Sequence, residues 1–505
     1  MQRLLTGILI LIIVLMSSCR KDFDTVHSQG DFRIEKDTLF LDSVFTNISS
    51  HTYRFKIYNT SSKEISINKI HLEKGEESFY RLNVDGNPGK SFENVLIHAN
   101  DSIFVFVEVT ADINQLENPV YEEKLLVEDD SKTEDVLLTA FVKDANFYYP
   151  ERYPDGSHET LILYTDPESG DTIETQGFFL EDDTTFTDEK PIVIYGHMAV
   201  PAGHTLTIEQ GAHLYFHFNS GLIVWEDATL KVNGSLGHEV IFEDDRMEEE
   251  YEHHPGLWNY IWLRQNSKNN EINYAIIKNA EIGVKVFPTE NPNPVLQIKN
   301  TQIYDSSLAG IFSVAGSITG ENLVMNNFGI SAINIQLGGS YDFKHCTFAN
   351  YSGGNRNEKS ATVFVSNYIK TEDETYLYDL QKFNMSNCIV YGNAYIEFFM
   401  DKNEEAGFNY AIDNSLIRFE DPQNRFADIA EVNFSDTAHY NNIILNEDPE
   451  FEDAQENKMA IIDTSPCVNQ GNPATAQAVP LDIRQINRTA APDLGAYQHI
   501  FSNKK

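Results

Sequence analysis

The sequence is poor in cysteine and in positive charge. Only 4 of its 505 residues are cysteines, and 37 lysines and arginines stand against 77 aspartates and glutamates, for a net charge of -40. Apart from Cys19 in the N-terminal segment, three cysteines remain, and this odd number in an exported chain indicates no disulfide framework. A strongly negative chain repels the phosphates of nucleic acid, so we expect no nucleic acid among its partners.

The chain also lacks a long hydrophobic run. The apolar stretch Leu4 to Met16 is too short to cross about 30 Å of hydrocarbon as a helix and is typical of an export signal. The junction SSC resembles a bacterial lipobox, although Met16 stands where leucine is usual. The resemblance implies a signal peptide over residues 1–18, acylation of Cys19 and attachment to a membrane through this N-terminal lipid. An ordinary signal peptide with a chance cysteine is the alternative.

Residues 31–145 alternate apolar and polar side chains with a period of two. In TYRFKIYN, for example, Tyr53, Phe55 and Ile57 fall on one face of a predicted strand. Similar runs recur between turn-forming stretches at a spacing that suits an antiparallel β-sandwich. We therefore predict an immunoglobulin-like domain of about seven strands, preceded by a tether over residues 19–30.

A less regular segment, residues 146–190, follows this domain. It is rich in proline, aspartate and tyrosine and has no sustained periodicity. We interpret it as a linker or a packed extension.

Internal repeats organise residues 191–500. Six segments superpose at intervals of 26, 21, 24, 42 and 27 residues. One equivalent position holds Ala275, Thr301, Asn322, Cys346, Cys388 and Ser415, and another holds Ile277, Ile303, Val324, Phe348, Val390 and Ile417. Short β-runs with this period, broken by Asn and Gly turns, predict coils of parallel strands stacked about 4.8 Å apart.

The predicted fold class is therefore all-β, with the immunoglobulin-like β-sandwich followed by a right-handed parallel β-helix, a single-stranded solenoid that ends in a C-terminal cap. The 42-residue interval predicts one coil with an excursion. The same register makes Cys346 and Cys388 small core residues of neighbouring coils rather than a metal pair or a disulfide.

Several stretches match a known group of proteins. They include MAVPAGHTLTIEQGAHLYF, PGLWNYIWLRQNSKNNEINYAIIKN and the closing PDLGAYQ, with Asp493, Gly495, Ala496 and Tyr497. On these stretches the chain resembles the right-handed parallel β-helix repeat-containing surface lipoproteins of Gram-negative bacteria, which have a pectate-lyase-like solenoid. The resemblance implies an outer membrane lipoprotein at the cell surface. Because this fold hosts lyases, hydrolases, adhesins and scaffolds, it assigns no activity.

The stretch EDDRMEEEYEHHPG, Glu243 to Gly256, predicts an acidic loop between two strands. Carboxylates are hard oxygen ligands suited to Ca²⁺, and the two histidines could bind a transition metal. The candidate metal ligands are Asp244, Asp245, Glu248, His253 and His254. A solvated loop is the alternative, because the pattern of an EF-hand is absent and neighbouring histidines point apart in extended backbone. No other cofactor is indicated.

Trp258 and Trp262 are four residues apart in a predicted strand, so we expect them to face the same side. They would form either an aromatic platform for a sugar ring or part of the core. Scattered charged residues in the repeats are candidates for a Ca²⁺-dependent lyase, namely Lys278, Asp305, Asp342 and Lys344. A glycoside hydrolase needs two flanking carboxylates, but with 77 acidic residues such pairs arise by chance, and the sequence singles out no catalytic residue.

These observations together predict a surface-anchored lipoprotein whose parallel β-helix presents a binding or structural surface for glycans, with no catalyst required. Two alternatives stay open. One is a carbohydrate-active enzyme, either a polysaccharide lyase or a glycoside hydrolase on the β-helix. The other is a purely structural envelope protein.

Overall fold

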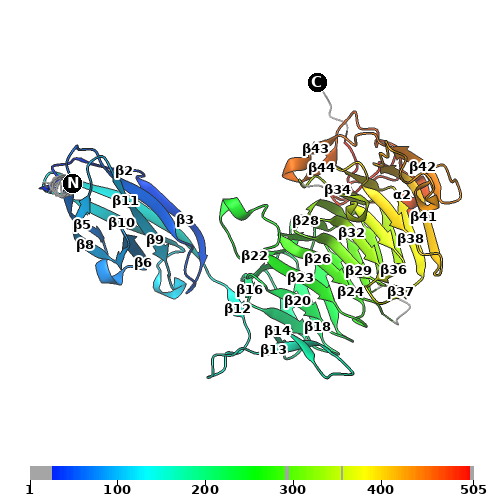
Figure 1. Ribbon diagram of the computed structural model, residues 1–505, viewed down its shortest axis with the longest axis horizontal. Helices are drawn as coiled ribbons and strands as arrows, with labels where there is room; N and C mark the ends of the chain where they lie inside the picture. The colour runs from blue at the N-terminus through cyan, green and yellow to red at the C-terminus, as the bar shows by residue number, and fades with distance from the viewer. Residues whose placement is uncertain (1–24, 290–294, 354–355, 501–505) are drawn as a thin grey trace, which may run out of the picture. The chain divides into compact units, whose positions relative to one another are not determined.

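The computed structural model describes residues 25–289, 295–353 and 356–500, which form two compact units with a boundary after Asp144. The chain is nearly all β, as predicted (Figure 1). Within the described ranges the α-helical segment is α2 (Pro473–Ala478), and no helix there is long and apolar enough to span a membrane. Cys19, the predicted lipidation site, lies outside the described residues.

The first unit is a β-sandwich of two sheets that share one apolar core. One sheet has six strands and the other has five. In the six-stranded sheet, β5 pairs with β8 in addition to β1 and β10. The six-stranded sheet contains β1 (Val26–His27), β5 (Ile65–Leu72), β10 (Val120–Glu128), β11 (Thr133–Lys143), β3 (Thr38–Phe45) and β8 (Ser91–Ile97). The five-stranded sheet contains β2 (Phe32–Ile34), β4 (Tyr53–Asn59), β9 (Ser102–Val109), β6 (Tyr80–Val84) and β7 (Asn87–Gly89).

The sandwich departs from the predicted antiparallel arrangement in two pairs. Strands β1 and β5 are parallel, and so are β3 and β11. Short strands such as β1, β2 and β7 raise the number of strands in the described part of this unit above the seven expected. The alternation of buried and outward side chains along β4 and β9 is as predicted, while the immunoglobulin-like topology stays a prediction.

The second unit is the solenoid predicted from the repeats. Its strands stack in parallel into two long sheets of nineteen and ten strands around one core (Figure 1). From β12 to β38, each strand of the larger sheet pairs in parallel with the strand two positions further along, as β16 does with β19 and β19 with β22. Because each coil adds to the sheets of the previous coil, apolar side chains fill the interior continuously from Phe178 to Tyr440.

Within each of the two solenoid sheets the strands follow one another in chain order. The nineteen-stranded sheet contains β12 (Asn146–Tyr148), β15 (Thr184–Phe186), β16 (Ile192–Ile194), β18 (Thr205–Glu209), β19 (His213–Phe216), β21 (Thr229–Asn233), β22 (Val240–Asp244), β24 (Asn270–Asn273), β25 (Ala275–Lys278), β27 (Leu296–Lys299), β28 (Gln302–Ser306), β30 (Ser317–Glu321), β31 (Val324–Phe328), β33 (Gly339–Lys344), β34 (Thr347–Asn350), β38 (Leu380–Ser386), β39 (Ile389–Gly392), β41 (Phe408–Ile417) and β42 (Tyr440–Leu445). The ten-stranded sheet contains β13 (Thr160–Thr165), β14 (Thr172–Phe179), β17 (His197–Val200), β20 (Gly221–Val224), β23 (Trp258–Leu263), β26 (Ala280–Val286), β29 (Ala309–Val314), β32 (Ser331–Gln336), β35 (Val363–Ser366) and β40 (Phe398–Asp401).

Residues 146–190, interpreted from the sequence as a linker or a packed extension, carry strands of this unit. Strand β12 pairs with β16, β14 with β17 and β15 with β18, all in parallel. Strands β13 and β14 form an antiparallel hairpin at the start of the ten-stranded sheet. The aspartates and most of the tyrosines that hide the periodicity of this segment lie on exposed turns and strand faces, while Tyr148 packs against the core.

The repeat register is correct except at one coil. The predicted repeat aligns Thr301 with Asn322 and Ile303 with Val324. In the structure β28 pairs with β31 so that Ile303 lies beside Met325, one residue later. Asn322 instead occupies a left-handed corner with φ of 56°, where asparagine is favoured because its short polar side chain tolerates that backbone. The corner residues form a ladder of their own: Asn322 Nδ2 donates to Asn300 Oδ1 at 2.8 Å.

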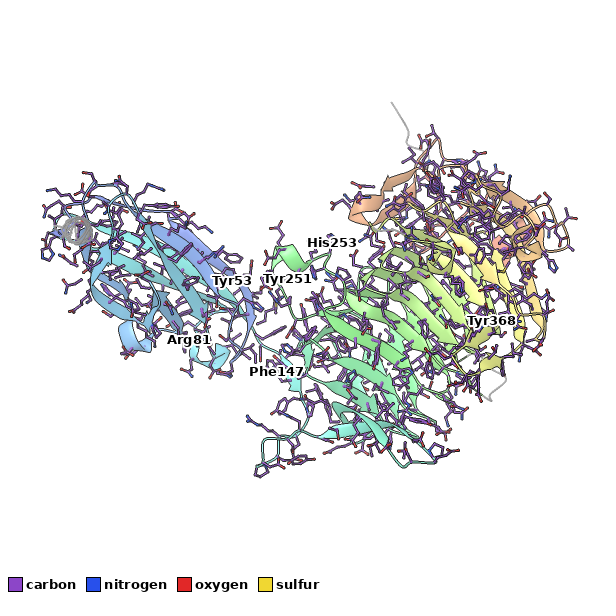
Figure 2. The ribbon with its side chains drawn as sticks, viewed as in Figure 1. Tyr53, Arg81, Phe147, Tyr251, His253 and Tyr368 are labelled. Atoms are coloured by element: carbon purple, nitrogen blue, oxygen red, sulfur yellow. The ribbon has the colours of Figure 1, made fainter. Side chains whose placement is uncertain are left out.

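Two further repeat-based predictions are confirmed. Cys346 and Cys388 are buried and free, and the Cys346 backbone N lies 3.5 Å from Cys388 Sγ, as expected for stacked core residues. The long interval between them contains an excursion that includes η4 (Glu358–Ser360) and a hairpin of β36 (Tyr368–Lys370) and β37 (Thr375–Leu377). Tyr368 is labelled in Figure 2.

The C-terminal segment packs on the outside of the larger sheet. A small apolar cluster joins Tyr304 and Ala349 of the sheet to Met459, Ile483 and Ala496. The segment contains the hairpin of β43 (Phe451–Asp453) and β44 (Lys458–Ile461). The C-terminal segment therefore covers part of the outer face of the nineteen-stranded sheet.

Candidate functional site

The acidic loop does not gather its candidate ligands. Strand β22 runs on to Asp244, two residues beyond its expected end, and the loop with η3 (Glu249–Tyr251) leads to β23. Asp244 Oδ1 accepts from the Arg246 backbone N at 2.9 Å, and Oδ2 accepts from Asn279 Nδ2 at 2.9 Å. Asp245 is held by His217 Nδ1 at 2.8 Å. These two carboxylates thus have separate partners.

The other three candidates are dispersed as well. Glu248 forms an ion pair with Arg246 at 3.1 Å, and His253 Nδ1 lies 3.0 Å from Asp305 Oδ2. The His254 ring packs edge-on against Tyr251 at 5.6 Å between centroids. Figure 2 labels Tyr251 and His253 on this loop. Across residues 25–289, 295–353 and 356–500 no three His, Cys, Asp or Glu side chains are arranged to hold a metal ion.

Glu243 and Asp244 have pKa values shifted in opposite directions. Burial raises the pKa of Asp244 to about 6. Burial also opposes ionisation of Glu243, but the bonds to His213 and Lys278 outweigh it and lower the pKa of that carboxyl. Opposite shifts often mark an acid and a base in one active site. Here the two residues are neighbours in a strand and point to opposite faces, so they cannot flank one glycosidic bond.

The expectation that Trp258 and Trp262 share a face is wrong. The register between β23 and β26 shifts between Tyr260 and Ile261, where β26 carries one extra residue, Gly283. The alternation along β23 breaks there, so that Ile261 and Leu263 face the core with Trp258, and Tyr260 and Trp262 do not. Trp258 points into the core, where it stacks on Phe216 at 4.3 Å and donates to the Lys278 carbonyl at 2.8 Å. Trp262 points outward, yet it is only 8% exposed because Leu161 of β13 packs on it. Neither ring is an open platform.

Trp262 belongs to an aromatic cluster that holds two cations. Arg264 lies 3.9 Å from the ring centroid of Trp225 and Lys285 lies 4.2 Å from that of Trp262. Burial lowers the pKa of both basic groups. Arg264 also donates to the Leu163 carbonyl at 2.9 Å, which ties the β13–β14 hairpin to the outer face of the sheet.

A cavity of ≈ 500 Å³ adjoins this cluster on the same sheet. Its lining comes from β14, from the turns that precede β17 and β20, from His197 of β17 and from Asn259 of β23, so four different coils contribute. Tyr195, His217 and Phe218 supply rings, and Phe218 is 63% exposed. The polar lining consists of the side chains of Glu174, Thr175, Gln176, His197, Asn219 and Asn259.

The floor of the cavity is fixed by His197, which is 3% exposed. Its Nε2 lies 3.2 Å from Asn259 Nδ2, and its Nδ1 lies 2.9 Å from Thr175 Oγ1. Burial lowers the pKa of His197, so the ring is neutral at pH 7. With the Asn259 amide as donor to Nε2, the proton is on Nδ1, and His197 orients Asn259 and Thr175 toward the cavity.

The walls are fixed by backbone geometry and by the acidic loop. Gly196 has φ of 69°, and a Cβ there would lie 2.9 Å from Pro150 Cγ, so this turn requires glycine. His217 stacks on Tyr195 with ring centroids 4.5 Å apart and is held from behind by Asp245. The loop predicted as a metal site therefore supports one wall of the cavity. Nothing in the sequence signalled the cavity itself, because its residues belong to no local motif.

No family model matches the sequence, and no curated protein matches it. Among solved structures the chain is similar to a family 123 glycoside hydrolase from Clostridium perfringens, with 10% identity over 21% of this chain and 23% of that chain and a TM-score of 0.16. It is also similar to the catalytic unit of a GH87 alpha-1,3-glucanase from Streptomyces thermodiastaticus, with 11% identity over 72% of this chain and 73% of that chain and a TM-score of 0.29. A third is the Agl-KA catalytic domain, with 10% identity over 77% of this chain and 99% of that chain and a TM-score of 0.21. At these identities and TM-scores no residue role carries over to this chain.

Proposed function

We propose that the protein binds a glycan in the cavity on the ten-stranded sheet. The observation that carries the proposal is the lining: exposed rings beside amides, a hydroxyl and one carboxylate in ≈ 500 Å³. A sugar ring presents an apolar face that packs on aromatic side chains and hydroxyls that pair with amide and carboxylate groups. A few convergent polar groups in an aromatic-lined concave site are the general form of a small-ligand site.

A second candidate is glycoside hydrolysis at the same cavity. Glu174 lines it and accepts hydrogen bonds from Thr160 and Thr172 at 3.0 and 3.1 Å. Asp245 stands behind His217 and provides a second carboxylate near the opposite wall. Hydrolysis requires two carboxylates on either side of the bond, and Glu174 and Asp245 are the pair that we would test. Glycan binding needs only the lining and is the simpler function.

Phe218→Ala should weaken glycan binding by about tenfold, or 1.4 kcal/mol, because truncation removes the most exposed ring of the cavity. The measurement is calorimetric titration of the purified mature protein, first with a broad panel of polysaccharides and then with those that bind. Tyr376→Ala, which removes another half-exposed aromatic on the β36–β37 hairpin, is the matched control and should leave affinity unchanged.

The same panel separates the classes of function. Retention without product supports a binding protein. New reducing ends without Ca²⁺ that disappear in Glu174→Gln indicate a hydrolase, and unsaturated products formed only with Ca²⁺ indicate a lyase. Neither binding nor turnover across a wide panel would leave a structural envelope protein as the remaining class and would refute the glycan proposal.

We also propose that the mature chain is anchored at the outer membrane surface through acylated Cys19. The support is the sequence alone, an apolar run followed by SSC. Cys19→Ala should move the protein from the membrane fraction to the soluble exported fraction, because attachment relies on the lipid. Fractionation of cells that express either form checks this, and unchanged membrane retention of the variant would contradict lipidation.

A further inference from the structure

The outer face of the five-stranded sheet in the first unit combines basic and aromatic side chains. The pairing of β2, β4, β9 and β6 sets Arg33 beside Tyr58, Lys56 beside Phe104 and Arg81 beside Glu108. Arg54 is placed opposite Phe106 on the same face. We call this set the basic face: Arg33, Arg54, Lys56, Tyr58, Arg81, Phe104 and Phe106. Arg81 is labelled in Figure 2.

The rings of the basic face position the cations. Arg33 lies 4.3 Å from the ring centroid of Tyr58, and Lys56 and Arg54 lie 4.7 and 5.4 Å from that of Phe104. Phe104 and Phe106 stack with centroids 5.7 Å apart. Such contacts hold the charged ends near the sheet at a favourable energy of about 0.5–1 kcal/mol each when exposed. The positive charges therefore form a fixed array.

Three of these cations have no ion-pair partner in the part of the chain that the structure describes: Arg33, Arg54 and Lys56. Within the described residues, Glu35 Oε2 accepts from the Lys56 backbone N at 2.8 Å, a contact that leaves the Lys56 ammonium unpaired. A cluster of unpaired cations in a strongly negative protein is complementary to an anion from outside.

A cavity of ≈ 330 Å³ opens on the same face. Its lining includes Phe106, Thr52, Asn83 and Pro88 together with the pair of Arg81 and Glu108, whose atoms are 3.1 Å apart. A ring, a hydroxyl, an amide and a charged pair provide both apolar and hydrogen-bonding contacts for a sugar residue. The unpaired cations lie on the adjoining strands.

We propose that the basic face is a second binding site, distinct from the cavity on the solenoid, and that it takes an acidic polysaccharide. The anionic groups of the polymer pair with Arg33, Arg54 and Lys56, and one of its sugar residues enters the cavity beside Arg81. A membrane surface fits less well, because interfacial binding requires apolar side chains that protrude into the lipid, and Phe104 and Phe106 are half-buried with cations over Phe104.

The test uses the full mature chain with Cys19→Ala, so that lipid attachment plays no part. Titration with dextran sulfate, polygalacturonate and uncharged dextran should show binding to at least one of the acidic polymers, weakening with salt, and none to dextran. Changing Arg33, Arg54 and Lys56 together to Gln should weaken that binding by about tenfold or more. The charge-retaining set Arg33→Lys, Arg54→Lys and Lys56→Arg keeps the net charge of the face and should weaken binding less than the Gln set does, with the remaining loss due to the altered ring contacts.

The control set Lys63→Gln, Lys69→Gln and Lys124→Gln removes the same charge from the turn after β4 and from the six-stranded sheet. Equal loss in both Gln sets would show a long-range field rather than a site and would overturn the proposal. Binding to vesicles of phosphatidylglycerol, without binding to either acidic polymer, would overturn it in favour of a membrane surface. Phe218→Ala in the solenoid cavity should leave acidic-polymer binding at the basic face unchanged, so the two proposals can fail separately.

Discussion

Replacing Glu397 by alanine should lower the free energy of unfolding of the solenoid by about 3–5 kcal/mol. Glu397 is fully buried, and the side chain of its partner Arg356 is 3% exposed. Both carboxylate oxygens accept from the guanidinium at 2.7 Å, and Thr362 and the Ala394 backbone N complete the set at 2.6 Å each. The alanine variant leaves a buried guanidinium without its counter-ion, and the desolvation of that charge is no longer offset.

A nearby surface pair provides the control. Glu404 is 82% exposed and forms an ion pair with Lys402 at 2.7 Å. Exposed pairs contribute at most about 1 kcal/mol, so Glu404→Ala should change stability little. Chemical denaturation of the three proteins, followed by circular dichroism, checks the difference. A decrease in the free energy of unfolding below about 1 kcal/mol for Glu397→Ala would show that water reaches Arg356 and that the ion pair is not buried from solvent.

Acid should destabilise the solenoid through His345, and His345→Asn should remove that contribution. Burial, with the positive charge of Arg488, lowers the pKa of His345 from 6.5 to about 2. A histidine whose folded pKa is depressed contributes stability above its unfolded pKa and loses it as pH falls. The window therefore runs from about pH 6.5 down to about pH 2. Between pH 7 and pH 5 the loss from this one group is about 2 kcal/mol.

Asparagine is the natural replacement at this corner. His345 has φ of 52° and Nε2 lies 2.9 Å from Asn387 Nδ2, in a row where Asn300, Asn322 and Asn387 also have left-handed backbone. Denaturation at pH 7 and at pH 5 should show a smaller pH dependence for His345→Asn by about 2 kcal/mol. The exposed His254→Asn should leave the pH dependence as in the wild type. An unchanged slope in His345→Asn would mean that His345 titrates normally.

The solenoid was predictable because stacked coils repeat the same short-range pattern of apolar residues and turns. The predicted register was wrong at Asn322, because the alignment treated this corner asparagine as a strand residue. Its place at the corner depends on the contact with Asn300 in the previous coil, which is not visible in the local sequence. The prediction that Trp258 and Trp262 share a face of β23 was wrong for a related reason. A bulge adds a residue to one strand only, and here that residue is Gly283 of the neighbouring strand β26, which the sequence WNYIWL does not reveal.

The candidate site was less predictable than the fold. Because of the high charge density of the acidic loop, the sequence predicted a site at Asp244, Asp245 and Glu248. In the structure these residues stabilise the loop, and of the three Asp245 contacts the cavity wall, through His217. The lining combines residues from β14 to β23 that meet only after four coils have stacked. On the basic face, the alternation in TYRFKIYN that places Tyr53, Phe55 and Ile57 on one face puts Arg54 and Lys56 on the other. Their pairing with Phe104 and Phe106 depends on strand order, which the sequence does not give.

The most direct test of the central claim is hydrogen–deuterium exchange of the mature protein with and without a glycan that binds. The proposed site predicts slower exchange in residues 174–177, 195–199, 217–221 and 258–262, the segments around the cavity on the ten-stranded sheet. Protection confined to other segments of the solenoid, with these four unchanged, would contradict the claim that this cavity is the glycan-binding site.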